Sequence, residues 1–184
     1  MTTEREAWLR GPIPGIPPLL MPVAHALVQV VEDVEASCRS LTVAELWSRP
    51  GGAASIGFHL KHLPGSLDRL FTYARGEALT PAQLERLRAE TVEGEPDSVA
   101  PLIDGLHQAV DAAVAQLAAA DPEALTEPRA VGRARLPSSV GGLLFHAAEH
   151  AARHSGQIAT TLRIVRGLGG GIISSSATRA SRSG

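Results

Sequence analysis

Hydrophobic residues recur with helical spacing in four long segments of the chain, which stretches rich in proline and glycine separate. In such a pattern, residues three or four positions apart line one face of a helix while polar residues occupy the other face. The first segment starts at Pro22, and proline suits the first turn of a helix. Its apolar stripe consists of Val23, Leu27, Val30 and Val34.

The other three segments have the same character. The second follows Ser55, a residue type that caps helices, and contains Pro64 in its interior. Its stripe consists of Ile56, Leu60, Leu63, Leu67 and Leu70. The third stripe consists of Val99, Leu102, Leu106, Val110, Ala113 and Leu117. The fourth helix is expected over residues 140–166, with Ser138 or Ser139 as its cap and the glycines of "GLGGG" as its end.

Short elements are predicted in the connections between these segments. "TVAE" (42–45) and "TPAQ" (80–83) have the pattern of a capping box and each should open a short helix. The stretch "TEPRAVGRARLPSS" (126–139) is expected to be irregular with some extended pieces, and it contains no convincing pair of strands. The pattern therefore predicts an all-α protein, a four-helix bundle with short extra helices in its connections.

Domain boundaries follow from the same pattern. Residues 1–20, which include "GPIPGIPP", are expected to be extended and packed on the surface, and residues 21–167 should form the bundle. Residues 168–184, which end in the small and polar stretch "ISSSATRASRSG", are predicted to be a flexible C-terminal tail.

Composition and charge exclude several classes of function. The chain is 44% hydrophobic but only 3% aromatic, so its core should consist of leucine, valine, isoleucine and alanine. Its net charge of −2 includes no run of like charges, which argues against nucleic acid or an anionic membrane as a partner. The uncharged stretch 11–31 contains five prolines, too many for a membrane helix. The single cysteine, Cys38, and an opening that lacks a signal-peptide pattern predict a cytoplasmic protein.

Three of the seven histidines lie in "FHAAEHAARHSGQ" (145–157), at positions 146, 150 and 154. Residues four apart lie on one side of a helix about 6 Å apart along its axis, so two such rings can reach one ion. His146 and His154 are separated by about 12 Å along the axis, too far for one ion with bonds of roughly 2.0–2.1 Å. A helical wheel points the pair His150 and His154 into the bundle and places His146 near the mouth. The alternative is that all three are polar residues on a half-exposed edge.

A metal ion would need a third ligand, and "GFHLKH" offers His59 and His62. The wheel places His59 nearer the apolar stripe, but Pro64 is close enough to distort the helix, so both stay candidates. His25 and His107 lie off the stripes of their helices and are expected to be surface or interface residues. Cys38 extends the first stripe, which predicts a small buried hydrophobe rather than a nucleophile.

The segments "SIGFHLKHLPGSLDRLFTYARGE" (55–77) and "LPSSVGGLLFHAAEHAARHSGQIATTLR" (136–163) resemble the DinB-like superfamily of YfiT-like metal-dependent proteins. The resemblance rests on an aromatic residue followed by x₃-His, and on a final H-x₃-H-x-G-Q. It implies a four-helix bundle that holds one divalent ion, zinc or nickel, through His62, His150 and His154. His59 is then the second choice.

Three histidines leave positions open on an ion, as in catalytic sites. The resemblance therefore implies a metal-dependent enzyme, either a transferase that uses a low-molecular-weight thiol such as mycothiol, bacillithiol or glutathione, or a hydrolase. Homodimers are common among such proteins, so a homodimer with a small-molecule substrate is expected. Residues placed to contact a substrate or support the ligands are Glu149, Arg153, Gln157 and Asp68. The alternatives are a metal-binding stress-response or assembly protein without catalysis, and a plain helical dimer.

Overall fold

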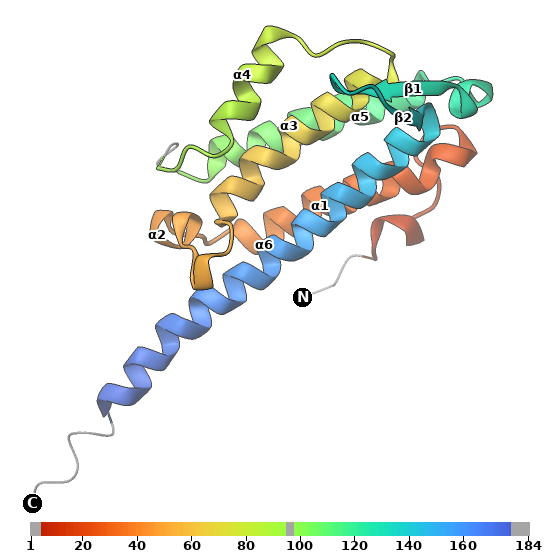
Figure 1. Cartoon of the computed structure of the whole chain (residues 1–184). Coiled ribbons are helices and arrows are strands. Elements are labelled where there is room, and N and C mark those ends of the chain that lie inside the picture. The colour runs from red at the N-terminus through yellow and green to blue at the C-terminus, as the bar shows by residue number, and fades with distance from the viewer. Residues whose placement is uncertain (1–4, 95–97, 178–184) are drawn as a thin grey trace, which may run out of the picture.

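Four long helices form the body of the protein, as the hydrophobic pattern predicts. The computed structural model describes residues 5–94 and 98–177, and within 168–177 it describes the backbone. The long helices are α1 (Met21–Cys38), α3 (Ile56–Ala74), α5 (Ala100–Ala118) and α6 (Val140–Ala177). Both α1 and α3 pack against α5 and α6, which closes a four-helix bundle (Figure 1). The all-α class is therefore confirmed.

The apolar stripes of the four helices meet in one core. Its fully buried side chains come from all four, and the largest are Leu27, Leu60, Leu63, Leu67, Leu106, Leu117, Leu144 and Ile158. Cys38 also belongs to this core, as predicted. Aliphatic side chains thus form nearly all of the interior, in keeping with the low aromatic content.

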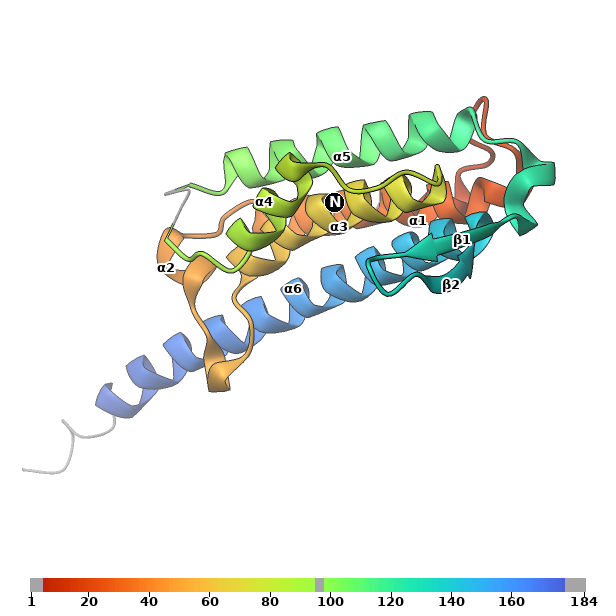
Figure 2. The same ribbon diagram turned by 45° about the horizontal axis from the view of Figure 1, so that its top comes forward.

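Two short helices lie beside α3 (Figure 2). They are α2 (Val43–Trp47) and α4 (Pro81–Ala89), and each begins with the capping box that the sequence predicted, at Thr42 and at Thr80. Short 3₁₀ helices at Pro50–Gly52 and Pro122–Thr126 lie in other connections. The end of α3 is a Schellman motif, in which Gly76 adopts a φ of 79° and Glu77 N–H donates to the carbonyl of Thr72.

The N-terminal segment is less extended than predicted. It forms 3₁₀ helices at Ala7–Leu9 and Pro18–Leu20. Ile16 and Leu20 are buried in the core, and the amide of Ala7 donates to the side chain of Gln29 on α1. Proline favours single turns as well as extended backbone, so a proline-rich composition did not distinguish the two.

The stretch between α5 and α6 contains a pair of strands, which corrects the sequence prediction. Antiparallel strands β1 (Pro128–Val131) and β2 (Leu136–Ser139) pair with Pro128 opposite Ser139. Their hydrophobic pattern is weak because no residue of either strand is fully buried and each strand contains a proline. The hairpin leads directly into α6, whose first turn Ser139 caps by accepting from the amide of Gly142 at 3.1 Å.

Helix α6 is longer than predicted. The sequence suggested an end near Arg166, whereas the helix continues through the "GLGGG" stretch to Ala177 and projects beyond the bundle (Figure 1). Glycine lowers helix stability by about 1 kcal/mol per residue relative to alanine but forbids no helical hydrogen bond, unlike proline. The predicted flexible tail thus begins with helix, and its last part, 178–184, lies outside the described residues.

Over the residues that the structure describes, no helix combines the length and the apolar character that crossing a membrane requires.

Candidate metal centre

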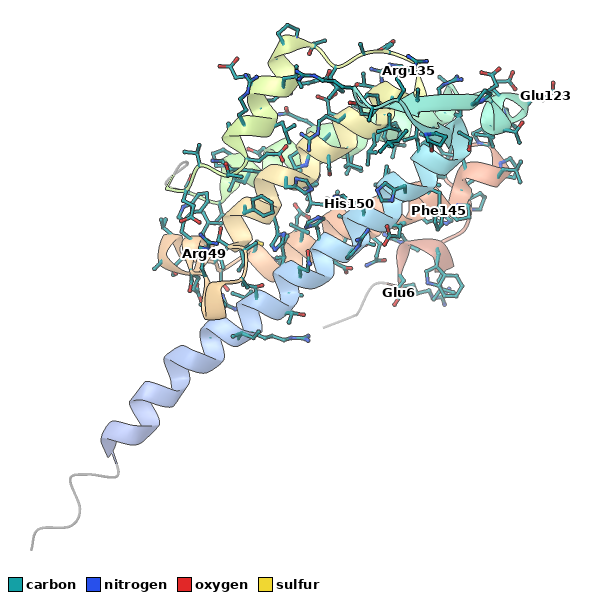
Figure 3. All side chains as sticks on the ribbon, viewed as in Figure 1. Glu6, Arg49, Glu123, Arg135, Phe145 and His150 are labelled. Atoms are coloured by element: carbon teal, nitrogen blue, oxygen red, sulfur yellow. The ribbon has the colours of Figure 1, made fainter. Side chains whose placement is uncertain are left out.

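Four histidines face one another between α3 and α6. His59 and His62 come from the N-terminal half of α3, and His150 and His154 come from the middle of α6 (Figure 3 labels His150). Three of them form a closer group, in which each side chain offers one ring nitrogen and these three nitrogens lie within 4.8 Å of one another. They are His62, His150 and His154. These three side chains are half-buried, so the group is covered by protein but open to solvent on one side.

The imidazoles meet nitrogen to nitrogen. The Nε2 atoms of His62 and His150 are 2.9 Å apart, and the Nδ1 atoms of His59 and His154 are 2.8 Å apart. A neutral imidazole carries one N–H and one lone pair, so such a pair is satisfied when one ring donates and the other accepts. A cation that receives both lone pairs satisfies it equally well.

A buried ion pair fixes the orientation of His62. Its Nδ1 lies 2.8 Å from Oε2 of Glu90, whose Oε1 accepts from Nη1 of Arg69 at 2.5 Å. Burial raises the pKa of Glu90, but the hydrogen bonds from His62 and Arg69 outweigh it and hold the pKa below its usual value. The carboxylate is therefore ionised and accepts a hydrogen bond from the Nδ1–H group of His62. In the neutral ring, Nε2 of His62 then has its lone pair free and turned toward His150.

Three features of α3 and α4 hold Glu90 in this position. The residue ends α4 and is only 5% exposed. Lys61 of α3 donates to the carbonyls of Ala89 and Val92 on either side of it, at 3.3 and 2.6 Å. Gly65 leaves the space that the carboxylate occupies, because a Cβ at this position would overlap Glu90. Lys61 and Gly65 flank His62 in sequence, so the same turns of α3 position the histidine and its partner.

Burial favours the neutral form of His59, His150 and His154. It lowers the pKa of His154 to about 3 and that of His59 to about 4, and the charges of neighbouring histidines act in the same direction. The pKa of His150 is also lowered, first by burial and then by His62. Neutral rings are the form that binds a metal ion.

This donor set fits a divalent ion. Three imidazole nitrogens come together from two helices. Histidine nitrogen is the commonest ligand for zinc in catalytic sites. A ligating histidine in such sites usually donates its second N–H to a carboxylate, and Glu90 occupies that position on His62. The ring of Phe58 stacks on His62 with centroids 5.4 Å apart and further limits its rotation.

The structure distinguishes the two histidines of α3 that the sequence left open. His62 joins His150 and His154, whereas His59 lies deeper, at 5% exposure, behind His154. The helical wheel ranked their depths correctly, yet the less buried residue is the one that reaches the group. His146 lies outside it at the surface, 51% exposed and 3.5 Å from Glu149.

The supporting residues chosen from the sequence do not contact the three histidines through hydrogen bonds. Arg153 pairs with Glu149 at 2.7 Å, and Asp68 pairs with Arg86 at 3.0 Å. Gln157 is exposed.

His25 contacts the carbonyl of Gly11, and His107 pairs with Glu35. These last two are surface histidines, as predicted.

Sequence reasoning missed Glu90 and Arg69, the two charged residues that support His62. One signal existed, because Gln83 and Glu90 are seven residues apart and therefore share a face of α4. Both are buried against α3. A buried face made of polar residues gives no hydrophobic stripe, so this helix looked solvent-exposed.

Comparison with known proteins shows the family of this chain. A family model described as the DinB superfamily matches residues 26–158, which span the bundle from α1 to the middle of α6. The chain belongs to the DinB superfamily. The matched range contains all four histidines of the centre as well as Glu90. The resemblance seen in two short segments is thus confirmed over most of the chain.

The superfamily fold is also seen in a solved structure. A crystal structure described as the conserved protein of locus from Enterococcus faecalis superposes with a TM-score of 0.63. The match covers 80% of this chain and 97% of that one, at 21% sequence identity. This likeness shows that the two proteins share a fold. No curated protein matches the sequence significantly.

Proposed function

We propose that this DinB-superfamily protein is a metal-dependent enzyme that holds one divalent ion, zinc or nickel, through His62, His150 and His154. The observation that carries the proposal is the meeting of three imidazoles that each offer one ring nitrogen within 4.8 Å of the others. The ion pair of Glu90 and Arg69 supports it, because it leaves the lone pair of His62 Nε2 aimed at the group.

Three protein ligands suit catalysis better than a purely structural role, because structural zinc sites usually take four. A divalent ion held in this way supplies Lewis acidity, which lowers the pKa of a water or thiol that binds beside the imidazoles. The chain's own residues orient the ligands, favour the neutral form of His150 and His154, and leave the group partly open to solvent. The proposed reactions are transfer of a low-molecular-weight thiol and hydrolysis.

A nearby cavity favours an enzyme over a metal-binding protein without catalysis. It has a volume of about 510 Å³, lies between α3, α4 and α5, and falls within the range of small-molecule sites. Its walls include Phe71, Arg75, Gln108 and Glu90. The histidines themselves do not line it, and Glu90 is the residue that connects the cavity with His62.

The test combines metal content with turnover. Protein purified without an affinity tag should contain close to one divalent ion per chain by mass spectrometry. Loaded protein should then consume a low-molecular-weight thiol in the presence of an electrophile, or hydrolyse a panel of esters and amides, and the metal-free protein should not. Metal without turnover would favour the non-catalytic alternative, and absence of metal binding would refute the proposal.

A further inference from the structure

His59 has no role in the three-histidine group, although it is one of the most buried polar residues of the chain. It is 5% exposed, and its Nδ1 lies 2.8 Å from Nδ1 of His154. A polar ring at such depth destabilises the fold unless it is hydrogen-bonded. An apolar residue would fill the same space and would need no hydrogen-bond partner. The presence of a histidine paired with His154 at this position therefore needs an explanation.

The contact between the two Nδ1 atoms has two possible hydrogen-bonding arrangements. If His154 donates from Nδ1 to the lone pair of His59, then Nε2 of a neutral His154 carries a lone pair. If His59 donates instead, a neutral His154 must carry its proton on Nε2, which then cannot bind a metal ion. The first arrangement alone leaves His154 competent as a ligand through Nε2.

We propose that His59 is a positioning residue that holds His154 in the Nδ1–H form, with Nε2 turned toward the metal ion. This inference rests on the metal site proposed above and adds a residue to it. His59 acts on His154 as Glu90 acts on His62, so two of the three ligands each have a buried acceptor. Helix α3 thus supplies one ligand, and it also supplies the group that orients a ligand on α6.

Two substitutions of equal size separate this role from simple packing. Asparagine places an oxygen acceptor about where Nδ1 of histidine lies, whereas leucine has the same shape without an acceptor. His59→Leu suits the apolar surroundings and a helix, so the protein should still fold. His146→Leu is the matched control, because His146 lies one turn from His150 and is half exposed.

The experiment measures the zinc affinity of the four proteins by competition with a chromophoric chelator, and the visible absorption of their Co²⁺ forms. We expect His59→Leu to weaken zinc binding by about 10- to 100-fold, the usual effect of removing a hydrogen-bond partner of a metal ligand. His59→Asn should restore most of the affinity and the wild-type Co²⁺ spectrum. His146→Leu should match the wild type.

Three results would overturn the inference while leaving the metal site intact. Unchanged affinity in His59→Leu would show that His59 only fills space. Equal losses in the leucine and asparagine variants would show that the acceptor is not what matters. Complete loss of binding in both, as severe as in His62→Ala, would make His59 a ligand. A wild type that binds no zinc would refute the metal site itself, and the inference with it.

Discussion

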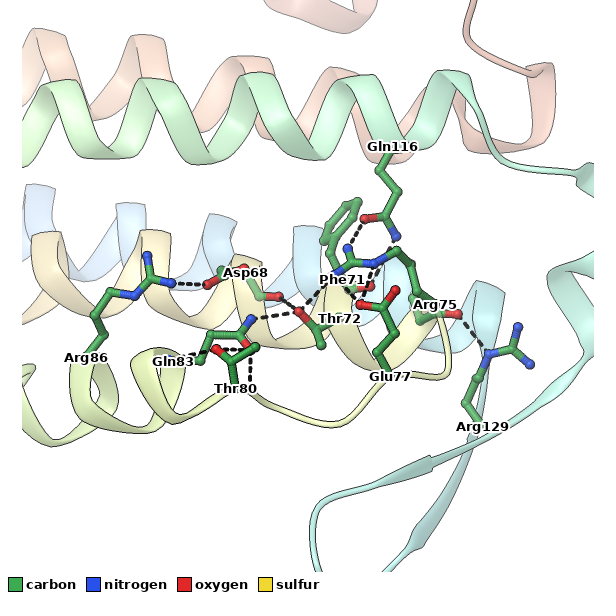
Figure 4. Close-up of polar contacts among 11 residues, drawn as sticks. Asp68, Phe71, Thr72, Arg75, Glu77, Thr80, Gln83, Arg86, Gln116 and Arg129 are labelled. Atoms are coloured by element: carbon green, nitrogen blue, oxygen red, sulfur yellow. Dashed lines mark hydrogen bonds and ion pairs between the residues drawn. The ribbon is translucent and has the colours of Figure 1, made fainter.

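Helix α3 carries two buried polar clusters that differ in how their atoms are paired. The cluster near its C-terminal end, around Thr72, matches donors with acceptors (Figure 4). Thr72 accepts from Nε2 of Gln83 at 2.8 Å and donates to the carbonyl of Asp68 at 2.7 Å. Arg75 donates to Gln116 and Glu77. This network is complete with protein atoms alone.

The cluster near the N-terminal end places ring nitrogens against ring nitrogens. His62 faces His150, and His59 faces His154, at distances below 3 Å. Each pair can form one hydrogen bond, and three of the rings keep nitrogens that converge on one point. The comparison teaches that burial of polar groups alone does not indicate a site. What indicates it is a group of ring nitrogens that face one another, so that a cation can take the place of the hydrogen bonds between them.

The largest difference between the clusters should appear in metal content. His62→Ala and His154→Ala should each reduce bound divalent metal from about one ion per chain to near zero, because two imidazoles bind an ion far more weakly than three. Gln83→Met, in the Thr72 cluster, should keep the metal. Mass spectrometry of purified protein measures all three. Metal retained in His62→Ala would contradict the assignment of the ligands.

Removing the metal should destabilise the protein. An ion at a hundred times its dissociation constant stabilises the folded state by about 2.7 kcal/mol if it does not bind the unfolded chain. For a chain of this length a chelator should therefore lower the melting temperature by about 5–10 °C. Calorimetry with and without chelator measures the shift. His62→Ala serves as the control and should show none, and an equal shift in this variant would mean that the ion stabilises the protein elsewhere.

Breaking the Thr72 cluster should lower stability without affecting the metal. Gln83 is 5% exposed, donates to Thr72 and accepts from the amide of Thr80, so Gln83→Met removes both of these hydrogen bonds. We expect the free energy of unfolding to fall by about 1–3 kcal/mol, measured by urea denaturation. Gln157→Met, at an exposed position of α6, is the control and should change stability little. A loss of metal in Gln83→Met would show that the two clusters are not independent.

Weakening the support of His62 should have a smaller effect. Glu90→Gln keeps the shape of the side chain but replaces a charged acceptor of the Nδ1 proton with a neutral one. Zinc affinity should fall by about tenfold, at the lower end of the range for such partners. Chelator competition measures it, with Glu149→Gln as the control, since Glu149 pairs with Arg153 at the surface. Equal affinities of both variants and the wild type would remove Glu90 from the site.

Cys38 lies outside both clusters, in the hydrophobic core. The rate at which its thiol is alkylated therefore measures how often the core unfolds. Burial raises the pKa of its thiol to about 11, so the native protein at pH 8 presents a neutral, inaccessible thiol. Alkylation should therefore proceed only through unfolding, and the metal-free protein should react faster than the loaded one. In the unfolded chain the thiol ionises near its ordinary pKa of 9.0, below its folded value, so stability should fall as pH rises above 9. Rapid labelling of native protein would contradict this burial.

The bundle was predictable because its helices carry continuous apolar stripes, and the pair on α6 was predictable because two histidines four residues apart must share a side. Glu90 was not predictable in the same way. It lies 28 residues from His62 along the chain, and their contact depends on how α4 docks on α3. The hairpin and the end of α6 were missed for a different reason. Proline disfavours strands and glycine disfavours helices, but these local preferences are weak enough for the surrounding structure to override them.

Glu90 is placed to link metal binding at the three histidines with the occupancy of the neighbouring cavity. The same carboxylate accepts from His62 and forms part of the wall of the cavity between α3, α4 and α5. A molecule that occupied the cavity and hydrogen-bonded to Glu90 would compete with His62 for it and so change the affinity for metal. By reciprocity, metal loading would change the affinity for that molecule by the same factor. If both sites bind as proposed, one buried side chain makes the two binding events depend on each other.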